Sequence, residues 1–367
     1  MQNPFTQPKK LKILVGMSGG VDSSLAAALL IEQGYEVTGG FIKNWSDSKD
    51  LWTGECQWRG ERRDAMRVAA RLNIPLLTFD FESEYRKRVL DRMFEEYRKG
   101  ITPNPDILCN EEIKFGLFFE AAMKLGFDAI ATGHYARTKN GHLLTAIDPA
   151  KDQSYFLHRI SRESLAKSLF PIGEYKKEDV RRMAAERDLP VANKPDSQGI
   201  CFVGKLDFHK FLRKRNAPQP GNIVTVDGEI VGHHDGLDGY TIGQRQGIQV
   251  SKDRKAWYVA AKDRKKNQVI IVPDRDHPLL YKTDAQIEQM HLLHELPASG
   301  EIDVVTRYHA EPVRASIESR TQDGTTLHLR FDKPIWALTP GQSAVFYHGE
   351  ECLGGGFISE DAIDSAA

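Results

Sequence analysis

The sequence predicts an α/β protein, in which a doubly wound parallel sheet is followed by a small β-rich central domain and a C-terminal β-barrel. Strand-like and helix-like patterns alternate from residue 12 to about residue 125, which is typical of a parallel sheet with helices on both faces. From about residue 207 the chain changes to short strand-like runs separated by turn residues, which is typical of small barrels and sandwiches. We place the domains at residues 1–208, 209–280 and 281–367.

The elements of the first half follow from their apolar patterns. Short runs of branched apolar residues predict buried strands, and longer periodic segments predict helices. In chain order we expect strands at 11–17, 35–42, 74–80 and 127–134, and helices at about 22–33, 59–72, 83–99 and 113–125. Because the carboxyl ends of parallel strands share one edge, the ends of the first, second and fourth strands should face one crevice, where such sheets bind ligands.

The second half begins with a basic helix and a proline-rich break at residues 209–221. The sequence VDG between two alternating runs predicts a hairpin, and QDG and YHGE predict two further turns. We expect strands within residues 221–232, 256–263, 267–273, 301–309, 313–319, 325–331 and 342–348.

The composition gives information on the possible partners and the cellular location of the protein. The 367 residues carry 50 basic and 51 acidic side chains, so no global basicity indicates a nucleic-acid partner, although local patches can supply it. The first ten residues lack an apolar core, and no apolar run reaches the ~18 residues of a membrane span, so we expect a cytoplasmic protein without membrane contact. The cysteines, which form no CxxC pair and are expected to be reduced, are Cys56, Cys109, Cys201 and Cys352.

The stretch VGMSGGVDSSLAAALL, residues 15–30, predicts an anion site. Gly19 and Gly20 permit backbone angles and close approaches that a β-carbon forbids, and Asp22 and Ser23 favour a helix N-terminus. The N–H groups and the positive dipole end of that helix would point into the turn, as at many phosphate sites. An ordinary strand-to-helix turn is the alternative, but hydroxyls on both sides of the glycines favour the anion site. No GK[ST] follows, which excludes a Walker loop.

Two of the cysteines lie in polar stretches that contain proline or glycine. TPNPDILCN, residues 102–110, predicts an irregular loop in which Asp106 and Cys109 could face one site. DSQGICFVG, residues 196–204, places Cys201 after a glycine. We expect both thiols to be accessible, with pKa values lowered by a helix N-terminus or a cation, and we expect the fold to bring them together. A small buried residue is the alternative for each cysteine alone, and we expect Cys352 to be buried.

SGGVDS resembles the signature of the N-type ATP pyrophosphatases, which have an adenine nucleotide alpha-hydrolase-like fold. Together with KNW, TPNPDILCN, IATGHYAR, KDQSYFL, DSQGICFVG, GQRQGI, TRYH and TPGQSAVFYHGEECLGGG, it resembles the bacterial tRNA-specific 2-thiouridylases, the MnmA family, over nearly the whole chain. The resemblance implies ATP-dependent thiolation of C2 of the wobble uridine in tRNAs for Lys, Glu and Gln, through their anticodon stem-loops. It also implies ATP and Mg²⁺ as cofactors, AMP and pyrophosphate as products, a cysteine desulfurase or persulfide relay protein as sulfur donor, and a monomer.

The same resemblance assigns roles to individual residues. Cys109 would be the nucleophile, Cys201 the persulfide carrier that forms a transient disulfide with Cys109, and Asp106 the acid/base. No metal-ligating residues are assigned. Gly133 could admit an adenosine or be only a turn glycine. The binding residues implied are Gly16, Met17, Ser18, Gly19, Gly20, Val21, Asp22, Ser23, Ile42 and Gly133 for ATP; Asn104, Pro105 and Asp106 for the target base; and His134, Lys151, Asp152, Gln153, Arg307, Tyr308 and Gln342 for tRNA.

Three other functions fit parts of the pattern. An ATP-dependent ligase for a small molecule would share the glycine turn but leaves the two cysteine stretches and the β-rich half unexplained. An iron–sulfur thiolase could use Cys56, Cys109 and Cys201 as ligands. A non-catalytic RNA-binding module would bind tRNA without releasing pyrophosphate. HKFLRKRN, residues 209–216, is the basic stretch that we expect to contact phosphate.

Overall fold

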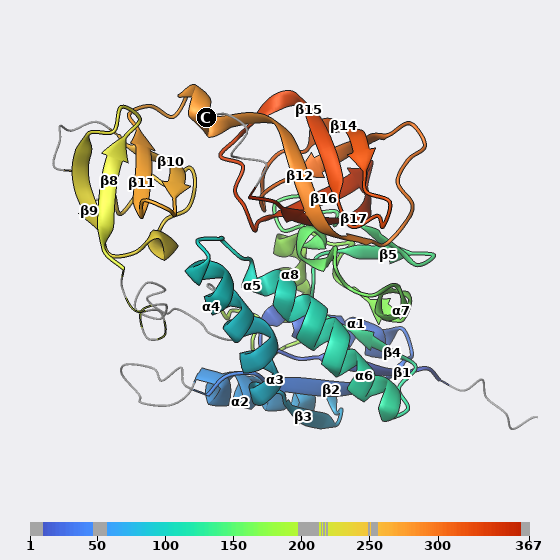
Figure 1. Ribbon diagram of the computed structural model, residues 1–367. Helices are drawn as coiled ribbons and strands as arrows, with labels where there is room; N and C mark the ends of the chain where they lie inside the picture. Colours follow the sequence, from blue (N-terminus) through green and yellow to red (C-terminus); the bar gives the residue numbers. More distant parts are fainter. Residues whose placement is uncertain are drawn as a thin grey trace, which may run out of the picture. The chain divides into compact units, whose positions relative to one another are not determined.

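The computed structural model describes residues 10–46, 57–196, 213, 215, 217, 219–248, 250 and 256–360. The chain divides into two compact units, which are described separately (Figure 1). The first contains Met1–Val89, Pro105–Lys205 and Glu350–Cys352, and the second contains Leu90–Asn104, Leu206–Gly349 and Leu353–Ala367. Within the described ranges, no helix is both long and apolar enough to span a membrane.

A five-stranded parallel sheet forms the centre of the first unit, with the order β3-β2-β1-β4-β7. The sequence runs outward from β1 to β3, returns to β4 on the other side of β1, and ends at β7. This order confirms the doubly wound sheet and puts its topological switch point between β1 and β4. The strands are β1 (Lys12–Gly16), β2 (Glu36–Lys43), β3 (Leu76–Asp80), β4 (Ala129–Ala131) and β7 (Ser168–Leu169).

Helices cover both faces of this sheet. On one face, α1 (Val21–Glu32) and α2 (Gln57–Leu72) bury Ala27 and Val68 against apolar side chains of β1 and β2. On the other face lies a helix made of α5 (Pro105–Leu108), the π-helical η2 (Cys109–Leu117) and α6 (Phe118–Lys124). Its Phe118 ring packs so closely on β2 that a β-carbon at Gly40 would lie 2.6 Å from it.

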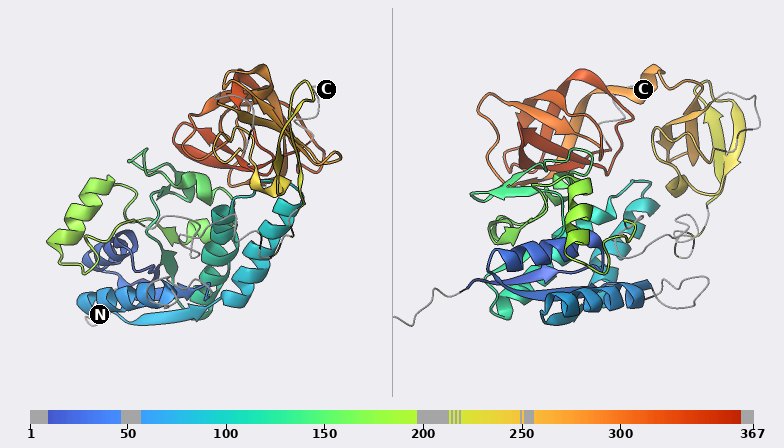
Figure 2. Two further views of the ribbon diagram at one scale, coloured as in Figure 1. Left: turned by 90° about the vertical axis from the view of Figure 1, so that its left-hand side faces the viewer. Right: turned by 180° about the vertical axis from the view of Figure 1, so that it is seen from behind.

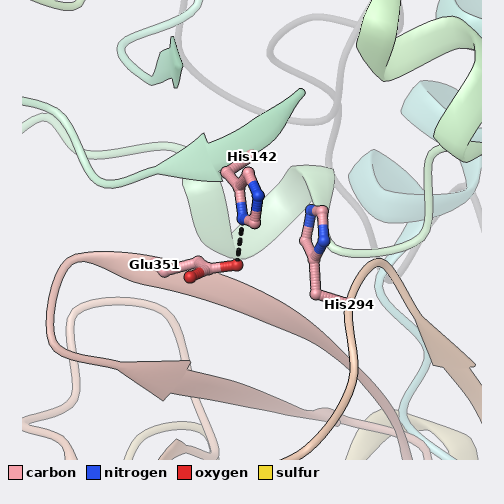
Figure 3. Close-up of side chains that lie close together, drawn as sticks. All are labelled: His142, His294 and Glu351. Atoms are coloured by element: carbon pink, nitrogen blue, oxygen red, sulfur yellow. Dashed lines mark hydrogen bonds and ion pairs between the residues drawn. The ribbon is translucent and has the colours of Figure 1, made fainter. Parts of the chain in front are cut away.

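The remaining elements of the first unit extend this layer structure. A hairpin of β5 (Arg137–Lys139) and β6 (His142–Leu144) pairs with the first two residues of β17, Glu351 and Cys352. Nδ1 of His142 lies 2.6 Å from a carboxylate oxygen of Glu351, which reinforces this pairing (Figure 3). The other elements are α3 (Glu82–Tyr85), η1 (Arg86–Leu90), η3 (Ser154–Leu157), α7 (Arg162–Ala166) and α8 (Lys177–Glu186).

The second unit is β-rich, and it begins with the helix α4 (Asp91–Arg98). A four-stranded sheet has the order β10-β11-β8-β9, and six antiparallel strands close into a barrel because β12 pairs with both β15 and β17 (Figure 2). Apolar side chains such as Ile302, Leu329 and Phe346 fill this barrel. The strands are β8 (Gly221–Thr225), β9 (Ile230–His234), β10 (Tyr258–Asp263), β11 (Gln268–Val272), β12 (Tyr281–Leu292), β13 (Glu301–Val305), β14 (Val313–Arg320), β15 (Leu327–Trp336), β16 (Ser343–His348) and β17 (Glu351–Ile358); short 3-10 turns are η4 (Leu237–Gly239) and η5 (Pro278–Leu280).

Two expectations about local structure were wrong or incomplete. The stretch 102–110 is not an irregular loop throughout, because a helix begins at Pro105, where a missing N–H costs nothing. The twelve-residue β12 was not predicted, since a register shift and a positive φ at Gln289 interrupt its alternation. The expected hairpin at VDG and the burial of Cys352 are confirmed. Most of the expected basic helix at 209–221 lies outside the described residues, as do Cys56 and Cys201.

Candidate active site

The glycine loop, residues 16–23, joins the carboxyl end of β1 to the N-terminus of α1. Gly20 is the N-cap and has no side chain, so the first N–H groups of α1 keep their capacity to bind an external acceptor. Hydroxyls brace the loop from within: the Ser18 N–H donates to Oγ of Ser23 at 3.2 Å, and the Ser24 hydroxyl donates to the Gly20 carbonyl at 2.7 Å. This braced helix terminus has the geometry of an anion site.

Two glycines in and beside the loop are required by packing within the protein. Gly19 has a φ of +74°, and a β-carbon there would lie 2.2 Å from the Glu61 carbonyl oxygen of α2. A β-carbon at Gly133, in the turn after β4, would lie 2.5 Å from the Ser23 backbone nitrogen. The turn after β4 therefore lies directly against the first turn of α1, and Gly133 permits this contact.

A charge network, consisting of Asp22, Lys151, Lys177, Arg181 and Asp196, surrounds the start of α1. Nζ of Lys177 lies 2.7 and 2.9 Å from the two oxygens of Asp22 and 2.8 Å from Asp196. Lys151 and Arg181 also contact Asp196, at 3.1 and 2.5 Å. Burial acts to raise the pKa of Asp196, but hydrogen bonds from Lys177 and Lys151 hold it below its ordinary value. Asp148 accepts a hydrogen bond from the Lys177 N–H at 2.9 Å, so cations and carboxylates alternate around the start of α1.

The residues just before the Cys201 stretch are attached to the glycine loop and to α8. Nζ of Lys194 donates to the Gly19 carbonyl at 2.9 Å and lies 2.7 Å from Asp64 of α2. Arg181 donates to the carbonyls of Ala192 and Lys194 at 3.2 and 3.0 Å. Cys201 itself lies outside the described residues.

Cys109 lies on the π-helical part of the second helix layer and has no exposed surface. Burial raises the pKa of its thiol to about 12, a rise that the charge of Lys114 opposes and that of Asp106 increases. The expectation of an accessible thiol with a lowered pKa at position 109 was therefore wrong. Ile107, Leu108 and Ile113, which are also buried, show that this turn of helix faces an apolar interior.

His134 connects the turn after β4 to the helix that carries Cys109. Nε2 of His134 lies 3.4 Å from Nζ of Lys114, and its Nδ1 lies 2.7 Å from the Thr132 hydroxyl. Burial, followed by the charge of Lys114, lowers the pKa of His134 well below its usual value, so the ring is neutral at pH 7. A single turn thus touches the glycine loop through Gly133 and the cysteine helix through His134.

The other predicted site residues of the first unit have well-defined contacts. Ile42 is buried near the carboxyl end of β2, on the expected edge of the sheet. Asp152 accepts hydrogen bonds from the Ala146 N–H and the Ser154 hydroxyl, at 2.8 and 2.7 Å. Gln153 and Tyr135 exchange two hydrogen bonds. These contacts hold the loop from which Lys151 extends.

The predicted site residues of the second unit are held by hydrogen bonds to their own surroundings. Arg307 donates to the Ala337 carbonyl at 3.2 Å, and the Tyr308 ring stacks on His309 with centroids 3.8 Å apart. Gln342 donates to the Thr102 carbonyl at 2.7 Å, which fixes the stretch that ends at Asn104. The unit boundary falls between Asn104 and Pro105, so these two predicted base-contacting residues belong to different units.

Sequence reasoning missed Lys177, Lys194 and Lys114. Lys177 lies in KKEDVRRM, one of several basic helical stretches, and Lys114 lies in IKF, another motif of the family resemblance to which no role was assigned. Lys194 has no local signal. Asp22, the carboxylate of the glycine loop, accepts hydrogen bonds from Lys177 and from the Tyr135 hydroxyl. A Mg²⁺ ion there would have to be held mainly by phosphate oxygens and water, as is common for this ion.

Comparisons with known proteins cover almost the whole chain. Residues 11–205 match the tRNA methyl transferase HUP domain family, residues 209–273 its PRC-barrel domain, and residues 282–358 the aminomethyltransferase beta-barrel domain. The tRNA-specific 2-thiouridylase MnmA of Chromobacterium violaceum is 46% identical over 358 residues, which cover 95% of this chain and 92% of that protein. The proteins of the same name from Janthinobacterium sp. (strain Marseille) and Stutzerimonas stutzeri (strain A1501) are 46% and 45% identical, covering 96% and 97% of this chain and 99% and 96% of theirs.

Proposed function

The chain belongs to the MnmA family of tRNA-specific 2-thiouridylases, and from this premise we propose that it converts the wobble uridine of tRNAs for Lys, Glu and Gln to 2-thiouridine. ATP and a persulfide would be consumed, and AMP and pyrophosphate released. The observation that carries the proposal is the turn after β4, which contacts the glycine loop through Gly133 and the Cys109 helix through His134. Nucleotide activation and thiol chemistry would therefore occur in one unit.

The first step is activation of the base. The pyrophosphate part of ATP would occupy the glycine loop, where the α1 N-terminus and the ammonium of Lys177 would stabilise a leaving anion. The uridine O2 attacks the α-phosphorus, the bond to the β-phosphate oxygen breaks, and pyrophosphate leaves. The adenylated oxygen is then a good leaving group on C2. Mg²⁺ would arrive with ATP and neutralise phosphate charge.

The second step delivers sulfur from a persulfide on Cys201. In one route, the Cys109 thiolate attacks the inner sulfur, and the released hydrosulfide adds to C2 and expels AMP. In the other route, the terminal sulfur attacks C2 directly and expels AMP, and Cys109 then attacks the sulfur that remains on Cys201, which breaks the S–S bond and frees the thiolated base. Both routes leave a disulfide between Cys109 and Cys201, which an external reductant reopens. Asp106 would transfer the proton at N3, an effect worth roughly 10²–10⁴-fold.

The remaining assignments complete this scheme. The target base would leave the anticodon loop to meet Asn104, Pro105 and Asp106. The exposed part of Lys151, with Arg307 and Tyr308, would contact tRNA. A cysteine desulfurase or a persulfide relay protein would load Cys201, and the enzyme would act as a monomer in the cytoplasm.

The test is formation of 2-thiouridine from unmodified tRNA, Mg-ATP and a persulfide source. We expect Cys109→Ser and Cys201→Ser each to abolish the product while retaining tRNA binding, and Asp106→Asn to slow it by at least about 100-fold. Cys352→Ala is the matched control, because Cys352 is buried in β17, and it should retain full turnover. Turnover by Cys201→Ser would remove its role as carrier. Turnover that depends on bound iron would favour a cluster enzyme instead.

A further inference from the structure

The helix that carries Cys109 has an unusual register. Residues Cys109–Leu117 are π-helical, and the Phe118 N–H bonds to the Ile113 carbonyl five residues earlier. π-Helical segments are mostly single turns and are frequent at functional sites. In this register, side chains five residues apart lie on the same side of the helix, whereas in an α-helix they would point about 140° apart. The π-helix therefore brings Lys114 to the side of Cys109.

Lys114 is oriented by His134 from a different element. An ammonium group only donates hydrogen bonds, so Nε2 of His134, 3.4 Å away, must act as acceptor and Nδ1 must carry the proton that faces the Thr132 hydroxyl. The rings of Phe115 and Phe170 pack against His134, with centroids 5.8 and 6.3 Å away. A neutral, buried histidine held in one orientation is a fixed acceptor for the lysine.

The surroundings of Cys109 require such a cation. The buried thiol stays protonated at neutral pH because its anion would lose its solvation, and Asp106 adds a repulsive charge. Lys114 acts in the opposite direction. His134 is uncharged, and the ammonium has three N–H donors, so Lys114 can donate to His134 and keep its charge available to a thiolate at Cys109.

We propose that Lys114, held in place by His134 and by the π-helical register, is the positioning cation that stabilises the Cys109 thiolate for attack on sulfur. The thiol proton leaves to a solvent base and Lys114 keeps its own proton, so a thiolate–ammonium pair results. This role rests on the proposed function of Cys109 as the nucleophile. The proposal also explains why this segment is π-helical, since in an α-helix the side chains of Cys109 and Lys114 would point in different directions.

The experiment measures alkylation of Cys109 by iodoacetamide in the full-length protein, without ATP or tRNA, between pH 6.5 and pH 10. Mass spectrometry of the peptides that contain Cys109 and Cys352 follows each thiol separately. In Lys114→Met we expect the alkylation rate of Cys109 to fall about tenfold across this pH range, because loss of the ammonium lowers the small fraction of the thiol that is ionised. Lys114→Arg should restore the wild-type profile. Lys124→Met, which removes an exposed lysine from the same helix layer, should change nothing.

The alkylation rate of the buried Cys352 shows whether Lys114→Met acts on Cys109 alone or loosens the whole fold. If Lys114→Met only loosened the fold, both cysteines would react faster, and that result would overturn the proposal. An unchanged Cys109 alkylation rate in Lys114→Met, or failure of Lys114→Arg to restore the wild-type rate, would overturn it as well. The thiolation assay of Cys109→Ser tests the nucleophile separately, so failure of the proposed function can be distinguished from failure of this inference.

Discussion

The glycine loop and the Cys109 helix belong to the same unit but differ in their readiness for chemistry. The loop is braced by its own hydroxyls, and the ammonium of Lys177 is held beside it by Asp22. Cys109 is fully buried, and its pKa of about 12 keeps it protonated. The glycine loop is therefore already ordered for binding a nucleotide, whereas the thiol of Cys109 must become exposed before it can react.

Among the variants that test this contrast, Gly133→Ala should have the largest effect, and it tests whether the loop is held in one conformation. The added methyl group would lie 2.5 Å from the Ser23 nitrogen, so the turn after β4 and the first turn of α1 must separate. We expect ATP affinity, measured by calorimetry, to fall roughly 100-fold, within the about 1–3 kcal/mol that overpacking costs. Gly60→Ala, which meets no atom within 4 Å, is the control. Unchanged affinity would mean that the loop adapts, and the contrast with Cys109 would weaken.

Lys177→Met tests the electrostatic part of the prepared site. It removes the ammonium that joins Asp22 to Asp196, so two carboxylates then face the anion site without this cation. We expect ATP to bind roughly 5- to 10-fold more weakly, since the network is partly exposed and screened. Lys176→Met, at an exposed neighbouring position, should bind ATP normally. Equal affinities of the two variants would show that the helix N-terminus alone suffices.

The pH dependence of stability tests the closed state of the thiol. The pKa of Cys109 is raised from 9.0 to about 12, so the folded state binds more protons than the unfolded state between these values. Its contribution to stability is therefore complete below pH 9 and is lost as the pH rises toward 12. In urea unfolding, wild type should lose about 1.3 kcal/mol more than Cys109→Ala between pH 8 and pH 10. Parallel losses would indicate that the thiol is already accessible.

Gln342→Ala should have the smallest effect, and it concerns the stretch that precedes the Cys109 helix. The change removes the 2.7 Å hydrogen bond to the Thr102 carbonyl, which is worth about 1 kcal/mol. We expect a slightly lower unfolding midpoint and a fall in thiolation rate of no more than about 5-fold. Gln322→Ala, in an exposed turn, is the control. A drop in rate as large as that of Cys109→Ser would assign Gln342 a direct part in the chemistry.

Local patterns in the sequence were enough to predict the glycine loop and most of the elements around it. Alternating runs predicted β1, α1, β2 and the hairpin of β8 and β9, because strand and helix periodicity and turn residues act over a few neighbours. Strand β12 was not predicted, because its register shift breaks the alternation of apolar and polar residues on which strand prediction depends.

By itself, the sequence determined the fold class, the anion loop and the resemblance that names the family. Only the tertiary structure decided that Cys109 is buried, that Lys177 binds Asp22 across 155 residues of chain, and that Lys114 meets His134. The physical reason is that burial and pairing of charges depend on atoms distant in the chain. A motif specifies which groups are available, and the packing around them sets the pKa and the geometry with which they act.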